Sequence, residues 1–220
     1  MIRTFIHQPD FMPWLGFFEK LKKSDVYVVL DDVQFSKRDW QNRDKIKTSQ
    51  GIKWLTVPVK TKKSFYQQIG DVEIDSSLNW KSKHLKTIQH SYAQSKYFEK
   101  HFVNLSKFYS NYYKKLIDFN LGLIKYISLE LRIEKKKIIK SSFLNIKSKG
   151  SQKIFDICKS LGSKYYITGE PSRDYLDCEN FKKNNIFIEW YKPNYIKYSQ
   201  LHGEFVSDLS SIDYLFNCVK

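Results

Sequence analysis

The stretch KIIKSSFLNIKSKGSQKIFDICKSLGSKYYITGEPSRDYLDCENFKKNNIFIEWYK (residues 137–192) decides the fold class, because extended and helical patterns alternate along it. Its apolar runs predict three strands, at 137–143, 164–169 and 186–192. The segment between the first two predicts a helix that Ser151 opens and Gly162 closes. A loop with a short helix precedes the third strand. Strands connected through helices pair in parallel with right-handed crossovers, so we expect a parallel sheet.

The chain before this stretch carries further strands. The expected elements are strands at 2–7, 26–32, 53–59 and 71–75 and a helix at 15–24. Pro9 and Pro13 resist helix formation, so the segment between the first strand and this helix is expected to be a loop.

The middle of the chain changes to a helical pattern. Residues 79–132 carry apolar side chains at the 3.6-residue spacing of amphipathic helices, and a final helix is expected at 211–218. We therefore expect a single α/β domain over residues 1–220. Its core would be a Rossmann-like, mostly parallel sheet with a helical segment at about 79–132.

The charge balance is strongly basic. The 220 residues include 38 Lys and Arg against 23 Asp and Glu, a formal net charge of +15. This balance suggests a phosphate-bearing partner such as a nucleotide, a nucleic acid or an anionic surface. The basic residues are almost all Lys spread along the whole chain, whereas nucleic-acid binders cluster their charge and use Arg for bidentate contacts. The sequence therefore allows nucleic acid as a partner without favouring it.

Several classes of protein find no support in the sequence. No apolar run approaches the roughly 20 residues of a membrane span, and the N-terminus lacks the pattern of a signal peptide, so we expect a cytoplasmic location. The three cysteines are widely spaced without a CxxC pair, which supports neither a disulfide framework nor a zinc site. The P-loop, dinucleotide-binding, zincin and α/β-hydrolase motifs do not occur, so no motif indicates a metal or a dinucleotide cofactor.

Polar residues gather where the predicted strands end. The first strand ends at His7 and Gln8. The second ends at Asp31 and Asp32, and a later strand ends at Gly169. Ligands of open parallel sheets bind at the carboxyl ends of the strands, so we expect the site there.

The first cluster, HQPDFMPWLG (residues 7–16), joins a polar pair to an aromatic loop and a helix entry. Backbone N–H groups near Gly16 could face an anion or a phosphate. The alternative is a rigid aromatic plug that places Phe11 and Trp14 in the core.

The second cluster, LDDVQFSKRDWQNRDKIK (residues 30–47), gathers acids, amides, two Arg and a Trp. Arg38 or Arg43 could hold a diphosphate through bidentate hydrogen bonds, and Trp40 could stack on a base or a sugar. Its two adjacent Asp are a weak indication of Mg²⁺. The alternative is a solvated loop.

The third cluster is GEPSRDYLD (residues 169–177). Gly169 permits close approach of a ligand, Arg173 is one of only five Arg, and either Asp could orient a hydroxyl or act as a base. The alternative is a capped helix start with Ser172 or Asp174 as the N-cap.

Two histidines are acid–base candidates. His7 borders the first cluster, and His84 lies in the predicted helical segment. A lone histidine is more often structural, so both interpretations stay open for each of them.

Together the clusters resemble the WbqC-like family. The match runs in order from residue 7 to residue 218 and rests mainly on two specific motifs, QPDFMPWLGFF and DDVQFSKRDWQNR. Cys218 departs from the family pattern, which favours glycine there, so a turn glycine is missing. The motif positions present in this chain are Gln8, Pro9, Trp14, Gly16, Asp31, Gln34, Trp40, Arg43, His84, Tyr92, Gly169 and Tyr175.

This resemblance implies an enzyme of bacterial surface-polysaccharide biosynthesis, in O-antigen, lipopolysaccharide or capsule pathways. It implies transfer of an acyl group, or an aminoacyl group such as glycyl, to the amine of a nucleotide-linked amino sugar. The cofactor stays unknown, but an activated donor is expected, delivered by an acyl-carrier protein or an aminoacyl-tRNA.

Such a transfer needs a base, a diphosphate contact, a base stack and an oxyanion donor. The catalytic candidates for the base are His84, Asp31 and His7. Arg38 and Arg43 suit the diphosphate, and Trp40 or Trp14 suits the stack. The amide of Gln8 suits the oxyanion, as do backbone N–H groups of the first cluster. The substrate-binding candidates are Gln8, Trp14, Gly16, Gln34, Arg38, Trp40, Arg43, Tyr92, Gly169, Arg173 and Tyr175.

Two other functions stay open. One is an ATP-using nucleotidyl- or aminoacyl-activating enzyme of the HUP type, by loose analogy of the strand, Pro loop and helix entry, although the HxGH pair of that class is absent. The other is a non-catalytic nucleic-acid or carrier-binding module, which the net charge of +15 suggests.

Overall fold

The computed structural model describes residues 1–60, 66–194 and 197–220. The chain divides into two compact units. We call residues 1–8, 16–33 and 134–194 the sheet unit, and the described residues of 9–15, 34–133 and 195–220 the helical unit. The expectation of one domain over the whole chain stays a prediction. No helix within the described residues is long and apolar enough to cross a membrane.

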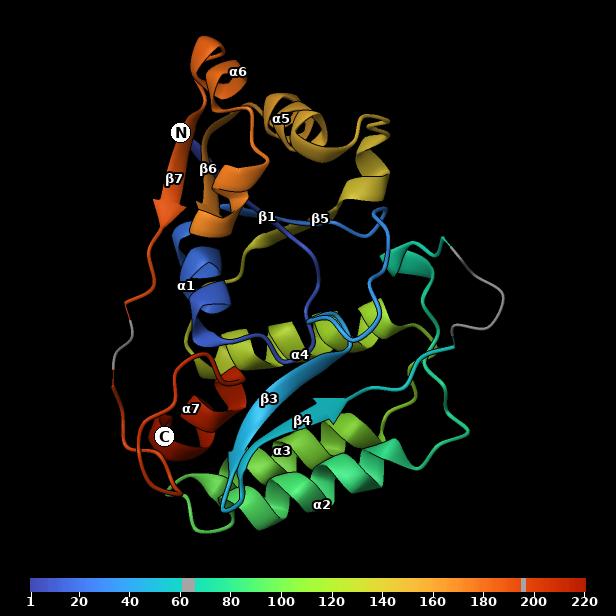
Figure 1. Ribbon diagram of the computed structural model, residues 1–220, viewed down its shortest axis with the longest axis vertical. Helices are drawn as coiled ribbons and strands as arrows, with labels where there is room; N and C mark the ends of the chain where they lie inside the picture. Colours follow the sequence, from blue (N-terminus) through green and yellow to red (C-terminus); the bar gives the residue numbers. More distant parts are fainter. Residues whose placement is uncertain (61–65, 195–196) are drawn as a thin grey trace. The chain divides into compact units, whose positions relative to one another are not determined.

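The sheet unit is built on a five-stranded parallel sheet (Figure 1). Its strands are β1 (Ile2–His7), β2 (Val26–Val29), β5 (Lys137–Lys140), β6 (Ser163–Gly169) and β7 (Phe187–Tyr191). Their order is β5-β2-β1-β6-β7, and all neighbours are parallel. The chain builds outward from β1 on one side and then returns to build outward on the other. This is the doubly wound order of Rossmann-like sheets, so the predicted fold class is confirmed.

Helices cover both faces of this sheet. They are α1 (Leu15–Lys23), α5 (Gly150–Ser160) and α6 (Cys178–Lys183), with the 3-10 turns η2 (Ser141–Leu144) and η3 (Glu170–Asp174). Phe17 of α1 packs on Phe5 and Tyr27, with ring centroids 5.1 and 5.6 Å apart. Val28 belongs to a buried cluster that includes Phe155 of α5. Successive strand side chains point to opposite faces, so Tyr27 and Val28 meet different helices. Sheets buried on both faces need near-continuous apolar strands, as β2 shows.

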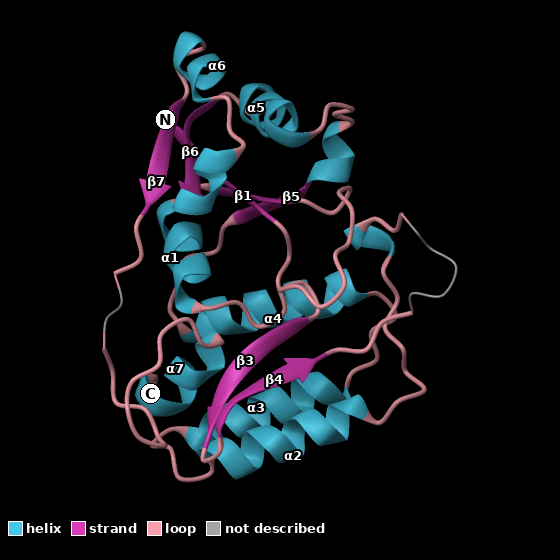
Figure 2. Ribbon diagram, viewed as in Figure 1, coloured by secondary structure: helices cyan, strands magenta, loops and turns pink. Residues whose placement is uncertain are grey.

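The helical unit contains helices and one hairpin (Figure 2). Its elements are β3 (Arg43–Thr48), β4 (Gly51–Thr56), η1 (Ile69–Asp71), α2 (Trp80–Tyr92), α3 (Phe98–Ser110), α4 (Leu116–Glu130) and α7 (Ser211–Cys218). Trp80 of α2 lies 5.7 Å from the ring of Tyr109 on α3 and 5.4 Å from Phe119 on α4. These aromatic side chains form the core between the helices, and the predicted helical segment is confirmed.

The strands of the helical unit differ from the sequence prediction at two places. Residues 71–75 form no strand, because η1 ends at Asp71 and only isolated bridges follow, at Glu73 and Ile74. Conversely, β3 was hidden within the polar cluster, where buried Asp44 and Lys47 interrupt the apolar alternation that normally reveals a strand.

Cap predictions in the sheet unit were partly wrong. Gly162, at φ +63°, ends α5 as expected. Ser151 does not open that helix, because Lys149 is the N-cap and the Ser151 hydroxyl instead accepts the backbone N–H of Asp177 at 2.8 Å.

The expected cap in the third cluster was also misplaced. Asp177, rather than Ser172 or Asp174, caps α6 by accepting the backbone N–H of Asn180 at 3.2 Å.

The strand predicted at 137–143 was too long, since β5 ends at Lys140 and η2 begins at the next residue.

Candidate functional site

The carboxyl edge of the sheet unit places β1 between β2 and β6. The chain continues from β1 to β2 on one side and from β6 to β7 on the other, so the boundary between β1 and β6 is the topological switch point at which such sheets bind ligands. Phe5 pairs with Ile167, and the two strands therefore reach the edge together, β1 at His7 and β6 at Gly169. The structure thus brings together two residues that the sequence placed 162 positions apart.

Lys20 is a buried cation at the same edge. Its side chain comes from α1 and is only 6% exposed. The ammonium would lie 3.9 Å from a Cβ on Gly169 and lies 5.3 Å from the ring of Phe5. The absence of a side chain at Gly169 leaves Lys20 close to the backbone at the end of β6. Lys20 was not predicted from the sequence, although it follows buried Phe17 by three residues and thus shares its helix face.

His7 is held as a neutral imidazole. Burial, together with the charge of Lys20, lowers the pKa of His7 to about 3. Its Nδ1 lies 2.9 Å from the backbone carbonyl of Gln8. A carbonyl only accepts, so Nδ1 carries the proton and Nε2 is the acceptor nitrogen. Phe5 and Phe17 each lie 5.4 Å from the imidazole ring and fix its orientation.

Two tyrosines complete the edge around His7 and Lys20. The Tyr27 hydroxyl donates to the Gln8 carbonyl at 3.4 Å, and the Tyr191 hydroxyl donates to the carboxylate of Glu19. The Lys20 ammonium lies 5.7 Å from the ring of Tyr191. Aromatic rings and a buried cation therefore surround the ends of β1, β6 and β7.

The carboxylate of Asp31, two residues after β2, accepts hydrogen bonds at both of its oxygens. Its Oδ1 accepts the backbone N–H of Ser142 at 2.9 Å and lies 3.2 Å from the Ser141 hydroxyl oxygen. Its Oδ2 accepts the Ser142 hydroxyl at 2.7 Å. These bonds tie β2 to the turn after β5, which is where η2 begins, and they account for a carboxylate only 7% exposed.

Asp32 forms an ion pair next to this cluster. Its Oδ2 lies 2.7 Å from the ammonium of Lys153, and its other oxygen accepts the Ser141 hydroxyl. Burial raises the pKa of Asp32, but hydrogen bonds from Lys153 and Ser141 outweigh it and leave the pKa below its usual value. The pair connects β2 to α5.

The third cluster forms a separate surface at the end of β6. Arg173 forms a salt bridge with Glu170 and lies 4.0 Å above the ring of Trp190. The Tyr175 hydroxyl lies 3.1 Å from that of Ser172, and Tyr175 is exposed. Gly169 is the member of this cluster that reaches Lys20.

His84 lies in the helical unit and is 6% exposed. Its Nε2 lies 3.1 Å from the Thr56 carbonyl, and its Nδ1 lies 3.3 Å from the Tyr109 hydroxyl. Burial lowers its pKa to about 4. The rings of Trp80 and Phe11 pack on it at 5.1 and 5.9 Å, so His84 joins β4 to the helices.

The second cluster presents an aromatic pair with a guanidinium. Trp40 lies 5.4 Å from Trp54, and the guanidinium of Arg43 lies 4.3 Å from the Trp54 ring. Both tryptophans are more than 40% exposed. We call Trp40, Arg43 and Trp54 the tryptophan platform. Arg38 stands at a turn with φ +58°.

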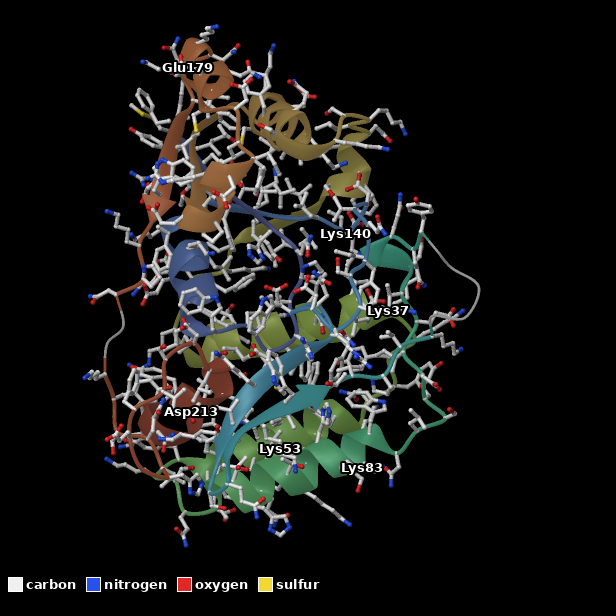
Figure 3. The ribbon with its side chains drawn as sticks, viewed as in Figure 1. Lys37, Lys53, Lys83, Lys140, Glu179 and Asp213 are labelled. Carbon is white, nitrogen blue, oxygen red and sulfur yellow. The ribbon has the colours of Figure 1, made fainter. Side chains whose placement is uncertain are left out.

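The remaining candidates have structural contacts. Trp14 bridges to Ser210, and Gln34 bridges to Gln68. Tyr92 is fully buried and donates to Asp213 of α7, labelled in Figure 3, at 2.8 Å. Gly16 is buried in the first turn of α1.

Of the residues predicted from the sequence, His7, Gln8, Gly16, Asp31, Gly169, Arg173 and Tyr175 belong to the sheet unit, and Trp14, Gln34, Arg38, Trp40, Arg43, His84 and Tyr92 to the helical unit. Phe11 is completely buried, as the aromatic-plug alternative expected, whereas Trp14 is only half-buried. Within the described part of the chain, no group of three or more His, Cys, Asp or Glu could hold a metal ion.

Comparison with known proteins gives one family and one close relative. The model of the WbqC-like protein family matches residues 8–220. The chain is 31% identical over 227 residues to the protein Rv1507c of Mycobacterium tuberculosis (strain ATCC 25618 / H37Rv), described as uncharacterized. That match covers 99% of this chain and 94% of the relative. No solved structure matches the chain.

Proposed function

Because the chain belongs to the WbqC-like protein family, we propose that it is a cytoplasmic enzyme of surface-polysaccharide biosynthesis that acylates an amino sugar. The donor group is an acyl or an aminoacyl group such as glycyl, and the acceptor is the amine of a nucleotide-linked sugar. The observation that carries the proposal is the buried Lys20 beside Gly169 and His7 at the switch point of the sheet.

Lys20 suits the diphosphate of a nucleotide-linked sugar. A buried ammonium interacts more strongly with an anion than an exposed one does, because the effective dielectric constant is lower. Gly169 offers close approach because no Cβ separates the end of β6 from the Lys20 ammonium. Arg38 and Arg43, the sequence candidates for this role, belong to the helical unit.

His7 suits the base of the transfer. The amine nitrogen attacks the carbonyl carbon of the activated donor, a C–N bond forms, and the bond from that carbon to the leaving group breaks. The proton lost by the amine passes to Nε2 of His7 and then to the leaving group. A diphosphate beside Lys20 would offset the charge that depresses the pKa of His7, so substrate binding would make His7 a stronger base.

The proposal is tested by transfer from an activated donor and by thermal shift. Binding to the native state raises the melting temperature by mass action. We expect one of the dTDP-, UDP-, GDP- or CMP-linked amino sugars to raise it, and its amine-free analogue to raise it less. A shift with ATP alone, with release of AMP or pyrophosphate, would replace the proposal with an activating enzyme.

The tryptophan platform favours a second candidate, the binding of nucleic acid as an aminoacyl-tRNA donor. Exposed tryptophans stack on bases of any sequence, and Arg adds charge. The net charge of +15 points the same way. RNA binding that weakens steeply with salt, and that is lost in Trp40→Ala, would support this candidate. An acyl-carrier protein as donor would instead leave binding to bulk tRNA undetectable.

A further inference from the structure

The hairpin of β3 and β4 has a buried face and a partly open face. Asp44 and Leu55 stand opposite each other on the two strands and are both 3% exposed, so they lie on the buried face. Side chains alternate along a strand, so the next opposite pair, Lys45 and Trp54, lies on the other face together with Arg43. Trp54 is 41% exposed there. The open face therefore carries two cations beside an exposed indole.

This open face is covered at one end. Lys47 is the next β3 residue on it and is only 4% exposed, because its ammonium donates to the carbonyls of Gly203, at 3.1 Å, and Glu204. Ile52, opposite Lys47 on β4, remains exposed. The accessible half of the face is therefore the half that contains the tryptophan platform.

Arg43 of the platform is a stacked cation without a hydrogen-bond acceptor. Its guanidinium lies 4.3 Å from the ring of Trp54, and no residue in the described part of the chain accepts a hydrogen bond from it. Arg173 of the sheet unit differs, since it stacks on Trp190 at 4.0 Å and also forms a salt bridge with Glu170. A ring face attracts the charge of a guanidinium but does not supply the oxygen acceptors that its five N–H donors need. Arg43 therefore retains the capacity to bind an anion.

Two indole rings accompany this cation. Trp40 lies 5.4 Å from Trp54 and is 44% exposed. Exposed aromatic rings beside an Arg form the arrangement on which unpaired bases stack while the cation contacts the backbone phosphate. In a duplex the bases stack on one another, so their faces are not available to the indoles.

We propose that the tryptophan platform binds unpaired nucleotides of a nucleic-acid strand. Bases stack on Trp40 and Trp54, and Arg43 holds a phosphate between them. An aminoacyl-tRNA carries its aminoacyl group on an unpaired 3′ end, and that end is the part of the donor that suits this surface. The identification of the strand with a donor rests on the proposed function, whereas strand binding itself does not.

The residue types favour a strand over other anionic partners. An acidic protein would satisfy Arg43 and Lys45, but its carboxylates offer no ring to stack on the two indoles. A free nucleotide offers one base and its phosphate, whereas a strand offers successive bases to the two neighbouring rings. A strand therefore accounts for both the aromatic and the charged members of the surface.

The experiment is fluorescence anisotropy of the full chain with a labelled single-stranded RNA of about 12 nucleotides. The same RNA annealed to its complement should bind at least about 10-fold more weakly. UMP and polyglutamate, at matched concentrations of negative charge, should displace the single strand poorly. Equal or tighter binding of the duplex would overturn the proposal. Efficient displacement by UMP would assign the surface to a free nucleotide, efficient displacement by polyglutamate would assign it to an acidic protein, and either would overturn the proposal.

Two variants assign the binding to the platform by their salt dependence. Trp40→Ala should weaken strand binding about 10-fold without changing the slope of log affinity against log salt, because it removes a stack and no charge. Arg43→Gln should weaken binding and reduce that slope by about 0.7, because one phosphate contact is lost. Unchanged binding in Trp40→Ala would overturn the proposal.

Matched controls come from exposed side chains of the same unit. Tyr112→Ala removes an exposed aromatic ring, and Lys83→Gln removes an exposed charge at a residue labelled in Figure 3. Both should bind the strand as the wild type does, and the melting temperatures of all four variants check that they fold. Equal weakening by Lys83→Gln and Arg43→Gln would show a diffuse charge effect and overturn the assignment to the platform.

The outcome is separable from that of the proposed function. Strand binding that depends on Trp40, without any transfer to an amino sugar, would retain the strand site and remove the transferase. Transfer activity together with unchanged strand binding in Trp40→Ala would retain the transferase and remove the strand site.

Discussion

Asp32 of the sheet unit and Asp44 of the helical unit are two carboxylates whose pKa values shift in opposite directions. In the sheet unit, Asp32 is paired with Lys153 and accepts a hydroxyl from Ser141, and its pKa lies below the usual value. In the helical unit, Asp44 accepts the backbone N–H of Lys45, and burial raises its pKa. A paired carboxylate stabilises the fold in its ionised form. A poorly paired one lowers stability and is better placed to respond to a ligand.

A similar contrast holds between His84 and His7. His84 of the helical unit is bound through both ring nitrogens to elements of its own unit, which is the environment of a structural residue. His7 of the sheet unit stands at the strand ends beside a buried cation. Burial alone therefore does not identify a functional group. Hydrogen bonds at both ring nitrogens identify His84 as structural, and the position of His7 at the strand ends near the charge of Lys20 makes it the candidate base.

The largest expected effect distinguishes the two histidines. His7→Gln should lower the transfer rate about 100-fold or more, because a general base contributes at least that much, while the melting temperature changes little. His84→Gln should do the reverse and lower the melting temperature, because its buried partners lose hydrogen bonds. Steady-state kinetics and thermal denaturation of both variants measure this. The exposed His90→Gln is the control, and a rate loss confined to His84→Gln would reverse the assignment.

The next effect concerns the buried cation. Lys20→Met should weaken binding of the nucleotide-linked sugar about 10- to 100-fold, because a charge-assisted contact to the diphosphate is lost. The variant should still fold, since methionine roughly fills the volume of the lysine side chain. Calorimetric titration and denaturant unfolding check the two parts. The exposed Lys22→Met on the same helix should match the wild type, and equal weakening by both would show a diffuse charge effect instead.

A smaller effect is expected for the ion pair of the sheet unit. Asp32→Asn should lower the free energy of unfolding by about 2 kcal/mol at neutral pH, because Lys153 loses a charged partner. The pKa of Asp32 is depressed in the folded state, so its contribution is present above the unfolded pKa of about 3.9 and is lost as the pH falls through the folded value. Urea unfolding from neutral to acidic pH should therefore show a steeper loss in the wild type. Parallel curves for the two proteins would disprove this account.

The smallest effect has the opposite sign. Asp44→Asn should raise the free energy of unfolding at neutral pH by about 1 kcal/mol, because the variant no longer has a carboxyl group that burial keeps from ionising. The raised pKa places the cost of Asp44 above its unfolded pKa of about 3.9, so the gain should disappear at lower pH. The same urea series measures it. Destabilisation at neutral pH would place Asp44 with Asp32 and remove the contrast between the units.

Local patterns predicted much of the fold. The strands β1, β2, β6 and β7 were found because their apolar runs are short and nearly continuous, and the helices of 79–132 because apolar residues recur every 3.6 residues. β3 escaped because Asp44 and Lys47 are buried polar residues, and their partners lie far away in sequence. Ser151 looked like a cap because its partner, the N–H of Asp177, is 26 residues away.

The residues of the candidate site were likewise predicted only in part. The sequence pointed to His7 and Gly169 through the rule that parallel strands present ligand sites at their carboxyl ends. It did not find Lys20, because one lysine among many carries no local sign of burial. The burial of Asp10 and Asp44 was not predicted for the same reason. Nothing in the sequence shows that these two carboxylates, 34 residues apart, both lie in the interior.

The sequence by itself determined the fold class, the positions of most strands and helices, and membership of the family, because these depend on periodicity and on motifs that are contiguous in the chain. Only the tertiary structure decided which polar groups are already satisfied. Asp31 and His84 have hydrogen bonds that commit them to the fold, and Lys20 and Asp44 are charged groups that the fold buries. The physical reason is that the free energy of a charge depends on its burial and its partners, and both are set by residues distant in sequence.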